Sequence, residues 1–459
     1  MGQIVDNSAM QSTGTRTATA AGGGRRRDGR DGFKTALGRP GMVAAVDLGA
    51  SKVACFIMKP DGPRRGDRTL TTAGVGYVQS HGVRGGSIVD MDEAAQAIAQ
   101  AVERAESMAG VDVQAVTVST TCGQLASHRV SAQVSLSARP IGEADLARAT
   151  AQAVSSLRLS RRQIIHLRPV AWSVDGQRHV RDPRSLFGRT LGLDMLVVSM
   201  NEAVFHTLGH CVERAHLHFA GAVAAPYASA LAALEEDEMD LGAICIDMGG
   251  GSTSVSVFSG GALVHVDSLA VGGHHVTQDI ARGLSTSMAG AERIKTLHGS
   301  AIASANEDRE MIEAPPRGDD PGAGPVVAPR SMLKGIIAPR VEETLELVKD
   351  RLKAAGALID PGAGIVLIGG ASQLAGVREV AVRVFDRTVR LGRPRRIPHL
   401  ADAASGPAFC AAAGVLQRAA FGPREADFKR PGANGRAVSN VDPKANMVVK
   451  AAAWLRENL

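Results

Sequence analysis

The chain has 459 residues and a mass of 47.6 kDa, a length that suits roughly two or three domains with a sizeable core. Aromatic residues make up only 3% of it, which argues against modules that stack nucleic-acid bases on rings. The five cysteines are irregularly spaced and match neither a zinc site nor a secreted disulfide framework. No segment approaches the about 18 apolar residues of a membrane span, and no secretion signal is evident. We expect a cytoplasmic protein that is not integral to a membrane.

The net charge of +6 is concentrated near the N-terminus. Residues 1–39 contain seven Lys and Arg residues against three Asp residues, a balance of +4. This Gly-, Arg- and Thr-rich segment has too few apolar residues to bury a core. We therefore expect residues 1–40 to form a disordered basic tail, which could weakly attract polyanions or anionic lipid.

The first ordered stretch has the pattern of an α/β layer. Residues 42–46 form a short apolar run typical of a buried strand, and Leu70 to Val78 form another strand after a break rich in Pro and Gly. Asp92 to Met108 has apolar residues at helical spacing, and Val113 to Ser119 returns to strand character. Strand, hairpin, helix and strand in this order indicate a sheet covered by helices.

A different pattern follows. Residues 123–198 alternate short strands with one helix, Glu143 to Leu157, which predicts a compact inserted α+β domain. After a helix from Glu202 to Ala215, the apolar strand Gly242 to Ile246 opens a second α/β layer.

The second layer continues to the C-terminal region. Residues 302–330 contain Pro, Gly and acidic residues and are expected to form a surface loop. Helices are expected from Lys334 to Ala355 and from Gly406 to Ala419, with a buried strand at 365–368 between them. The composition of residues 421–441 is that of a linker.

Three glycine-rich turns follow buried strands. Asp47 to Ser51 and Asp247 to Thr253 each separate two strands and form a duplicated unit, and Gly369-Gly370 ends a third strand. Glycine lets a backbone approach a phosphate closely, and a carboxylate at a strand end can hold Mg²⁺ through water. A single Asp-X-Gly turn is more often a tight hairpin. All three together predict a nucleotide site between two lobes.

These turns carry a family resemblance. Their order, with Ala291 to Lys295 between the second and third, resembles the actin/Hsp70/sugar-kinase ATPase superfamily. More closely, the chain is similar to the FtsA family of bacterial actin-like division proteins, from about residue 41 to residue 459. Further matching stretches are Gly85–Asp90, Asp175–Gln177, Cys211–Ala215, Tyr227–Leu231 and Gly260–His265.

The resemblance implies a two-lobed α/β actin-like fold. Its lobes are duplicated ribonuclease-H-like layers, with an inserted α+β subdomain and a C-terminal amphipathic helix. The expected parts are the tail 1–40, the first lobe 41–122 and 199–217, the inserted subdomain 123–198, the second lobe 218–283 and 362–420, the small subdomain 284–361, the linker 421–441 and the helix 442–459.

The resemblance also implies which residues bind ATP and Mg²⁺. Asp47 and Asp247 would hold the metal through water, and the pair Glu292 and Lys295 would face the ribose and adenine. Taken alone, that pair is more often an ordinary surface ion pair three residues apart on a helix. The other expected ligands are Gly49, Ser51 and Lys52 in the first phosphate loop, Gly249, Gly250, Gly251, Ser252 and Thr253 in the second, and Gly369 and Gly370 beneath the base.

Two departures bear on catalysis. Many relatives have an acidic residue where this chain has Ser254, and an acidic or amide residue where it has Ala225 before Pro226. Such groups orient Mg²⁺ or the attacking water in phosphoryl transfer. We assign no catalytic residue and expect at most a slow ATPase. The neighbouring His274 and His275 lack ligands at a metal spacing, so we expect a satisfied polar pair.

The C-terminal segment 442–459 has the pattern of an amphipathic helix. Asp442 and Pro443 suit its first positions, and Lys450, Arg456 and Glu457 lie opposite its apolar face. A helix in a membrane interface and a helix docked on protein both fit. The resemblance favours the membrane, with Lys450 at headgroup level above the apolar residues Met447, Val448, Ala451, Trp454, Leu455 and Leu459.

The remaining expectations concern partners. Arg330, Lys334 and Arg340 flank a helix start, where the family receives the C-terminal tail of FtsZ. The implied function is to tether FtsZ filaments to the cytoplasmic face of the inner membrane at the division site, with self-association into filaments. Other division proteins would bind the inserted subdomain, and no nucleic acid is expected. The alternative is a small-molecule kinase or polyphosphate phosphatase of the same superfamily.

Overall fold

The structure is a computed structural model that describes residues 42–421 except 62–68, 138, 304–307, 318–323, 359–360, 396 and 398–399. The expected tail 1–40, the linker after residue 421 and the helix 442–459 with its membrane residues lie outside the described part. Within that part, no helix is both long and apolar enough to cross a bilayer.

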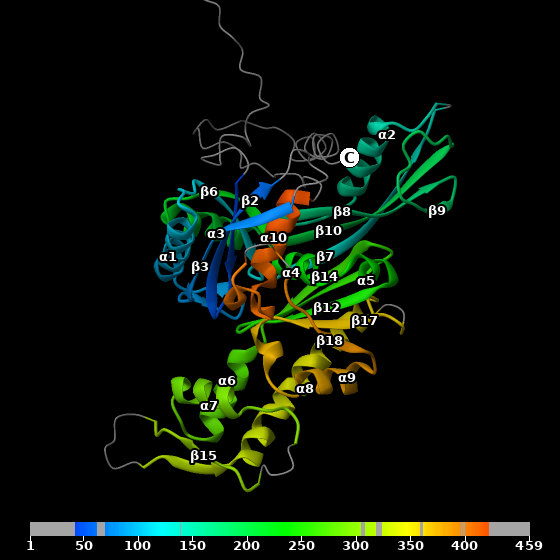
Figure 1. Ribbon diagram of the computed structural model, residues 1–459. Coiled ribbons are helices and arrows are strands. Elements are labelled where there is room, and N and C mark those ends of the chain that lie inside the picture. Colours follow the sequence, from blue (N-terminus) through cyan, green and yellow to red (C-terminus); the bar gives the residue numbers. More distant parts are fainter. Residues whose placement is uncertain are drawn as a thin grey trace, which may run out of the picture.

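The first lobe is built on a five-stranded sheet (Figure 1). Three strands form an antiparallel meander, and two further strands continue the sheet in parallel. In spatial order they are β3 (Thr69–Gln79), β2 (Lys52–Asp61), β1 (Val43–Leu48), β6 (Ala115–Thr120) and β11 (His218–Ala224). Because β11 pairs with β6, the chain crosses to the second lobe after residue 224, not at residue 218 as expected.

Helix α1 (Met91–Ala109) covers one face of this sheet. It begins where the Asp90 side chain accepts hydrogen bonds from the Asp92 and Glu93 amides, and it ends at Gly110, whose φ is 63°. Gly76 of β3 allows close packing, because a Cβ there would lie 2.1 Å from the Ala101 carbonyl oxygen. The other helices and short strands of this lobe are β4 (Val83–Arg84), β5 (Ser87–Ile88), α3 (Glu202–Arg214) and α10 (Cys410–Phe421). Helix α10 packs on β1, β2 and β6, so it lies on the sheet of the first lobe, whereas residues up to 420 were expected in the second.

The second lobe repeats the same strand arrangement. An antiparallel meander is again followed by two parallel strands, which makes the duplication visible in the topology. In spatial order the strands are β14 (Ala262–Leu269), β13 (Thr253–Ser259), β12 (Ala243–Met248), β17 (Gly364–Ile368) and β18 (Val389–Leu391). The accompanying helices are α4 (Ala225–Ala233), α5 (Glu236–Leu241), η1 (Gly370–Gln373), α9 (Val377–Phe385), η2 (Asp402–Ala404) and η3 (Pro407–Phe409).

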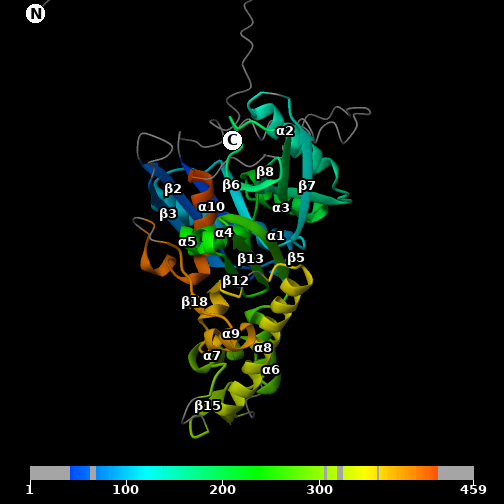
Figure 2. The same ribbon diagram turned by 90° about the vertical axis from the view of Figure 1, so that its right-hand side faces the viewer.

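The inserted subdomain extends this second sheet to nine strands. Helix α2 (Glu143–Ser155) packs on it through buried residues such as Leu146. Figures 1 and 2 show the subdomain at the end of the molecule far from β15. Its strands, outward from β14, are β7 (Ala126–Ser135), β10 (Thr190–Asn201), β8 (Arg162–Val174) and β9 (Gln177–Val180).

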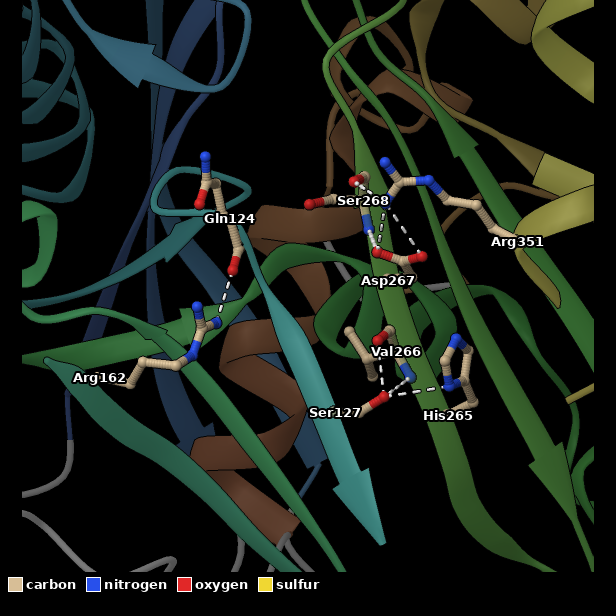
Figure 3. Close-up of polar contacts among 8 residues, drawn as sticks. All are labelled: Gln124, Ser127, Arg162, His265, Val266, Asp267, Ser268 and Arg351. Atoms are coloured by element: carbon tan, nitrogen blue, oxygen red, sulfur yellow. Dashed lines mark hydrogen bonds and ion pairs between the residues drawn. The ribbon is translucent and has the colours of Figure 1, made fainter. Parts of the chain in front are cut away.

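One residue pair and one side chain join β7 to β14 (Figure 3). Asp267 pairs with Ala126, and the Ser127 hydroxyl donates to the Val266 carbonyl (2.8 Å) and accepts from the Val266 amide (3.0 Å). On the other side of β14, Arg351 forms an ion pair with Asp267 at 3.1 Å. The inserted subdomain lies between two segments of the first lobe in the sequence, but its strands continue the sheet of the second lobe.

The small subdomain adjoins the second lobe, at the end of the molecule opposite the inserted subdomain (Figure 2). The expected loop 302–330 contains a hairpin, in which Ile312 and Ala328 are buried. Its strands are only four residues long and lie between Pro and acidic residues, so they leave little pattern in the sequence. The elements are α6 (Gly273–Gly283), α7 (Met288–His298), β15 (Met311–Ala314), β16 (Val326–Pro329) and α8 (Arg330–Ala354).

Candidate functional site

The first two glycine turns have the same backbone geometry. The Gly49 amide donates to the Lys52 carbonyl at 3.1 Å, and the Gly249 amide donates to the Ser252 carbonyl at 2.9 Å. The strand registers also correspond, since Asp47 pairs with Ala54 and Asp247 with Ser254. The two lobes therefore present equivalent loops.

These two loops meet directly. A Cβ on Gly251 would lie 2.7 Å from the Ala50 Cβ, and one on Gly250 would lie 1.9 Å from the Ser51 hydroxyl oxygen. The Ser252 and Thr121 hydroxyls are 3.0 Å apart across the same junction. Only glycine fits at positions 250 and 251, because any side chain would separate the lobes.

Two carboxylates lie at the base of the loops. Asp47 accepts a hydrogen bond from Ser119 in β6, and Asp247 accepts one from Ser229 in α4, both at 2.6 Å. The third turn reaches the second carboxylate, because a Cβ on Gly369 would lie 2.4 Å from Asp247 Oδ1. Gly369 has a φ of 85°, which favours glycine in its own right. All three predicted turns therefore converge near Asp247.

The charges of the two lobes act on each other here. Burial raises the pKa of Asp47, against the charge of Lys52 and the Ser119 hydrogen bond. Burial also raises the pKa of Asp247 to about 6; the Ser229 hydrogen bond and the charge of Lys52 oppose this shift, and the charge of Asp47 adds to it. Two buried carboxylates that repel each other favour a bound cation.

The charge of Lys52 acts on both of these acids. Burial lowers its pKa, and the charges of Asp47 and Asp247 counteract the shift. Its ammonium group donates to the Ala408 carbonyl and lies 4.1 Å from the centroid of the Phe409 ring. Lys52 is thus held between the loops and η3, within the electrostatic range of both carboxylates.

The start of α6 packs against the second loop. The amides of Gly273 and His274 donate to the carbonyls of Gly249 (2.9 Å) and Gly250 (2.8 Å). A Cβ on Gly272 would lie 2.6 Å from the Gly249 carbonyl oxygen. The sequence analysis did not assign this contact to the site, although two adjacent glycines before a helix were a usable signal.

The pair Glu292 and Lys295 is connected to α6. The Lys295 ammonium donates to Glu292 (2.7 Å), to the Thr277 hydroxyl (2.8 Å) and to the Gly273 carbonyl (3.3 Å). Thr277 in turn donates to Glu292 at 2.6 Å. Burial raises the pKa of Glu292, but the hydrogen bonds from Lys295 and Thr277 outweigh it and leave the pKa below its usual value. The pair is therefore part of a network that reaches the second loop through Gly273.

Ser254 and Thr253 follow the second loop on opposite faces of β13. Ser254 lies opposite Asp247 in the ladder, is buried, and its hydroxyl has no hydrogen-bond partner among the described residues. Thr253 pairs with Met248, so alternation directs its side chain to the other face of the sheet. Ala225 begins α4 and is also buried. Neither Ser254 nor Ala225 supplies a carboxylate near Asp247.

The expected partner-binding residues lie along α8. Arg330 forms an ion pair with Glu310, and Arg340 forms one with Asp279 on α6, both at an N···O distance of 2.6 Å. Lys334 also has a polar interaction. The two guanidinium groups therefore face different neighbours and are already neutralised by carboxylates of the same chain.

Comparisons of the sequence agree on one family. The family model described as "Cell division protein FtsA" matches residues 244–414, and the one described as "SHS2 domain inserted in FTSA" matches residues 122–199. The chain is 40% identical to "Cell division protein FtsA" of Agrobacterium fabrum strain C58 over 427 residues, which cover 92% of this chain and 95% of that protein. Identity to the Escherichia coli K12 protein of that name is 30%, over 82% of this chain and 89% of the relative.

A solved structure shares the fold. It is the "PilM-PilN type IV pilus biogenesis complex", at a TM-score of 0.58 and 15% identity, with 83% of this chain and 99% of that chain covered. The relatives favour a role in cell division over the kinase or phosphatase alternative. On these grounds the chain belongs to the FtsA family of actin-like cell division proteins.

Proposed function

We propose that this chain binds ATP with Mg²⁺ between its lobes and tethers FtsZ filaments to the cytoplasmic face of the inner membrane at the division site. Membership of an actin-like ATPase family implies nucleotide binding. The observation that carries the nucleotide assignment is the convergence of three glycine turns and the two carboxylates Asp47 and Asp247.

The residues present fit this ligand. Glycines at 250, 251 and 272 let the two loops and the start of α6 approach one another closely, so that the backbone of both loops is gathered at one place, as phosphate binding requires. Asp47 and Asp247 supply two oxygen-rich groups suited to a hydrated Mg²⁺, which would neutralise phosphate charge when bound. We assign the phosphates to the two loops, with Lys52 as their cationic partner. Glu292 and Lys295 would face the ribose and adenine, and Gly369 and Gly370 would lie beneath the adenine ring.

Hydrolysis is proposed to be slow. Phosphoryl transfer depends on positioning the attacking water and stabilising charge at the transferred group. Ser254 lies opposite Asp247 but offers a hydroxyl where a carboxylate would orient water or metal. Nucleotide binding would then serve to control assembly rather than turnover.

Attachment is proposed to need many copies. The segment 442–459 has only 18 residues and is rich in Ala, so at about 25 cal/mol per Å² of buried apolar area a helix formed by a single copy would bind a membrane weakly and reversibly. A filament presents many such helices at once, and multivalency makes the attachment stable. The FtsZ tail is assigned to Arg330, Lys334 and Arg340, where an acidic peptide would have to compete with Glu310 and Asp279.

A co-sedimentation assay tests the tether. The full chain and a chain ending at residue 441 are each mixed with anionic vesicles and FtsZ filaments, with and without ATP. We expect the full chain to bring FtsZ to the vesicle pellet, more so with ATP, and the shortened chain to leave both proteins in the supernatant. Equal sedimentation of the two chains would refute the assignment of the membrane anchor to residues 442–459.

A further inference from the structure

The imidazole of His274 links the two lobes at the junction of the glycine loops. Its Nε2 lies 3.0 Å from the hydroxyl oxygen of Ser51, a residue of the first loop. Its backbone amide is bonded to Gly250 of the second loop at 2.8 Å. His274 therefore contacts both loops at once, although the sequence analysis assigned it no role in the site.

The ring is held in a fixed position. A Cβ on Gly250 would lie 3.0 Å from Nε2 and 3.2 Å from Cε1, so this edge of the ring rests over the glycine backbone. The first turn of α6 fixes the main chain of His274, and the neighbouring His275 accepts a hydrogen bond from the Gly272 amide at 3.2 Å. The Nε2 atom thus points into the space where the loops meet.

We propose that His274 is a ligand of the terminal phosphate of the nucleotide, and that its Nε2–H exchanges the Ser51 hydroxyl for a phosphoryl oxygen. This inference rests on the proposed function of the site. In this assignment the outermost phosphate lies where the two loops meet, beside the Ser51–His274 contact, and the phosphates nearer to the sugar do not reach that contact. His274 then distinguishes a triphosphate from a diphosphate.

The chemistry of the exchange suits a histidine. A serine hydroxyl both donates and accepts, so it bonds either tautomer of the ring, while a phosphoryl oxygen only accepts and carries charge. A hydrogen bond to a charged acceptor is stronger than one to a neutral hydroxyl. The Lys295 and Glu292 side chains lie near enough to act electrostatically on the ring from the α7 side. A phosphoryl oxygen is therefore the better acceptor for the Nε2–H group, and without a bound phosphate the ring stays bonded to Ser51.

Calorimetric titration of the full chain with Mg²⁺ and either a non-hydrolysable ATP analogue or ADP tests the proposal. His274→Ala should lower affinity for the triphosphate about 10- to 100-fold, the usual range for a lost hydrogen bond to a charged group. ADP affinity should change by less than about threefold, since the diphosphate leaves the bond to Ser51 in place. His274→Gln keeps an N–H donor and should recover part of the loss. Gln278→Ala, at an exposed position of the same helix, is the matched control and should bind like the wild type.

The outcomes separate this inference from the proposed function. Equal losses for both nucleotides in His274→Ala, or no loss for either, would overturn the role of His274 while leaving the nucleotide site intact. Failure of the wild type to bind either nucleotide would overturn both. If the alanine variant unfolds, the contact is tested by the imidazole ¹⁵N resonances of the wild type. The resonances of His274 are identified as those that are missing from the spectrum of His274→Gln. The triphosphate should shift the Nε2 resonance and ADP should not, and identical spectra would exclude the contact.

Discussion

Replacing Asp247 with asparagine should change stability and ligand binding in opposite directions. Burial raises the pKa of this carboxyl from an ordinary 3.8 to about 6, so the folded protein holds its proton more tightly than the unfolded chain does. Stability should therefore fall as the pH rises between these two values. At 1.36 kcal/mol per pKa unit, the penalty above pH 6 is about 3 kcal/mol at most. Asp247→Asn removes it but weakens the bond to Ser229, so we expect a net gain of about 1–2 kcal/mol at pH 8.

Denaturant unfolding of the nucleotide-free protein at pH 5 and pH 8 measures this effect. The wild type should lose stability relative to Asp247→Asn as the pH rises, and the two should be closer at pH 5. Asp237→Asn, at an exposed position of α5, is the matched control and should follow the wild type. Titration with Mg²⁺ and ATP should show strongly weakened binding in Asp247→Asn alone. A variant less stable than the wild type at pH 8 would refute the reasoning, because it would mean that the folded protein stabilises the charged carboxylate.

Three further predictions concern turnover, the FtsZ tail and the membrane. Phosphate release from ATP should be well below the roughly 1–100 per second of kinases, since Ser254 supplies no carboxylate, and a rate in that range would contradict this view. Arg340→Glu should weaken binding of an FtsZ tail peptide and reduce its dependence on salt, measured by fluorescence anisotropy after a circular dichroism check of folding. Unchanged binding at low and high salt would move the peptide site elsewhere. Trp454→Glu should release the protein from anionic vesicles whereas Glu457→Gln should not, and a Trp454 emission spectrum that stays unshifted on adding vesicles would indicate a docked helix instead.

The sequence predicted those features of the site that follow one another closely along the chain. A buried strand, an Asp-X-Gly turn and a second strand are all local, so both loops and their carboxylates, Asp47 and Asp247, could be located before the fold was known. The inserted α+β subdomain was predictable for the same reason, because its strands alternate over a continuous segment. Local patterns thus accounted for the two lobes and for where their loops lie.

Features that depend on neighbours in space were not predictable in this way. Ser119 and Ser229 orient the two carboxylates from β6 and α4, and nothing in their local sequence indicates which acid they meet. The same holds for β11, whose parallel pairing with β6 assigns residues 218–224 to the first lobe. His274 carried the pattern of an unremarkable polar pair until α6 was placed against the Gly250 loop.

The inserted subdomain is attached to both lobes by different means. The chain joins it to the first lobe through the connections from β6 and to α3, and the His166 ring accepts the amide of Ala224 at 2.9 Å. To the second lobe it is joined by the pair Asp267 and Ala126, by the Ser127 hydroxyl, by an ion pair between Arg181 and Asp240 (3.7 Å) and by the His166 ring against Tyr227. A rotation of one lobe against the other must therefore disturb at least one of these attachments, because the subdomain is bonded to β11 of the first lobe and to β14 of the second.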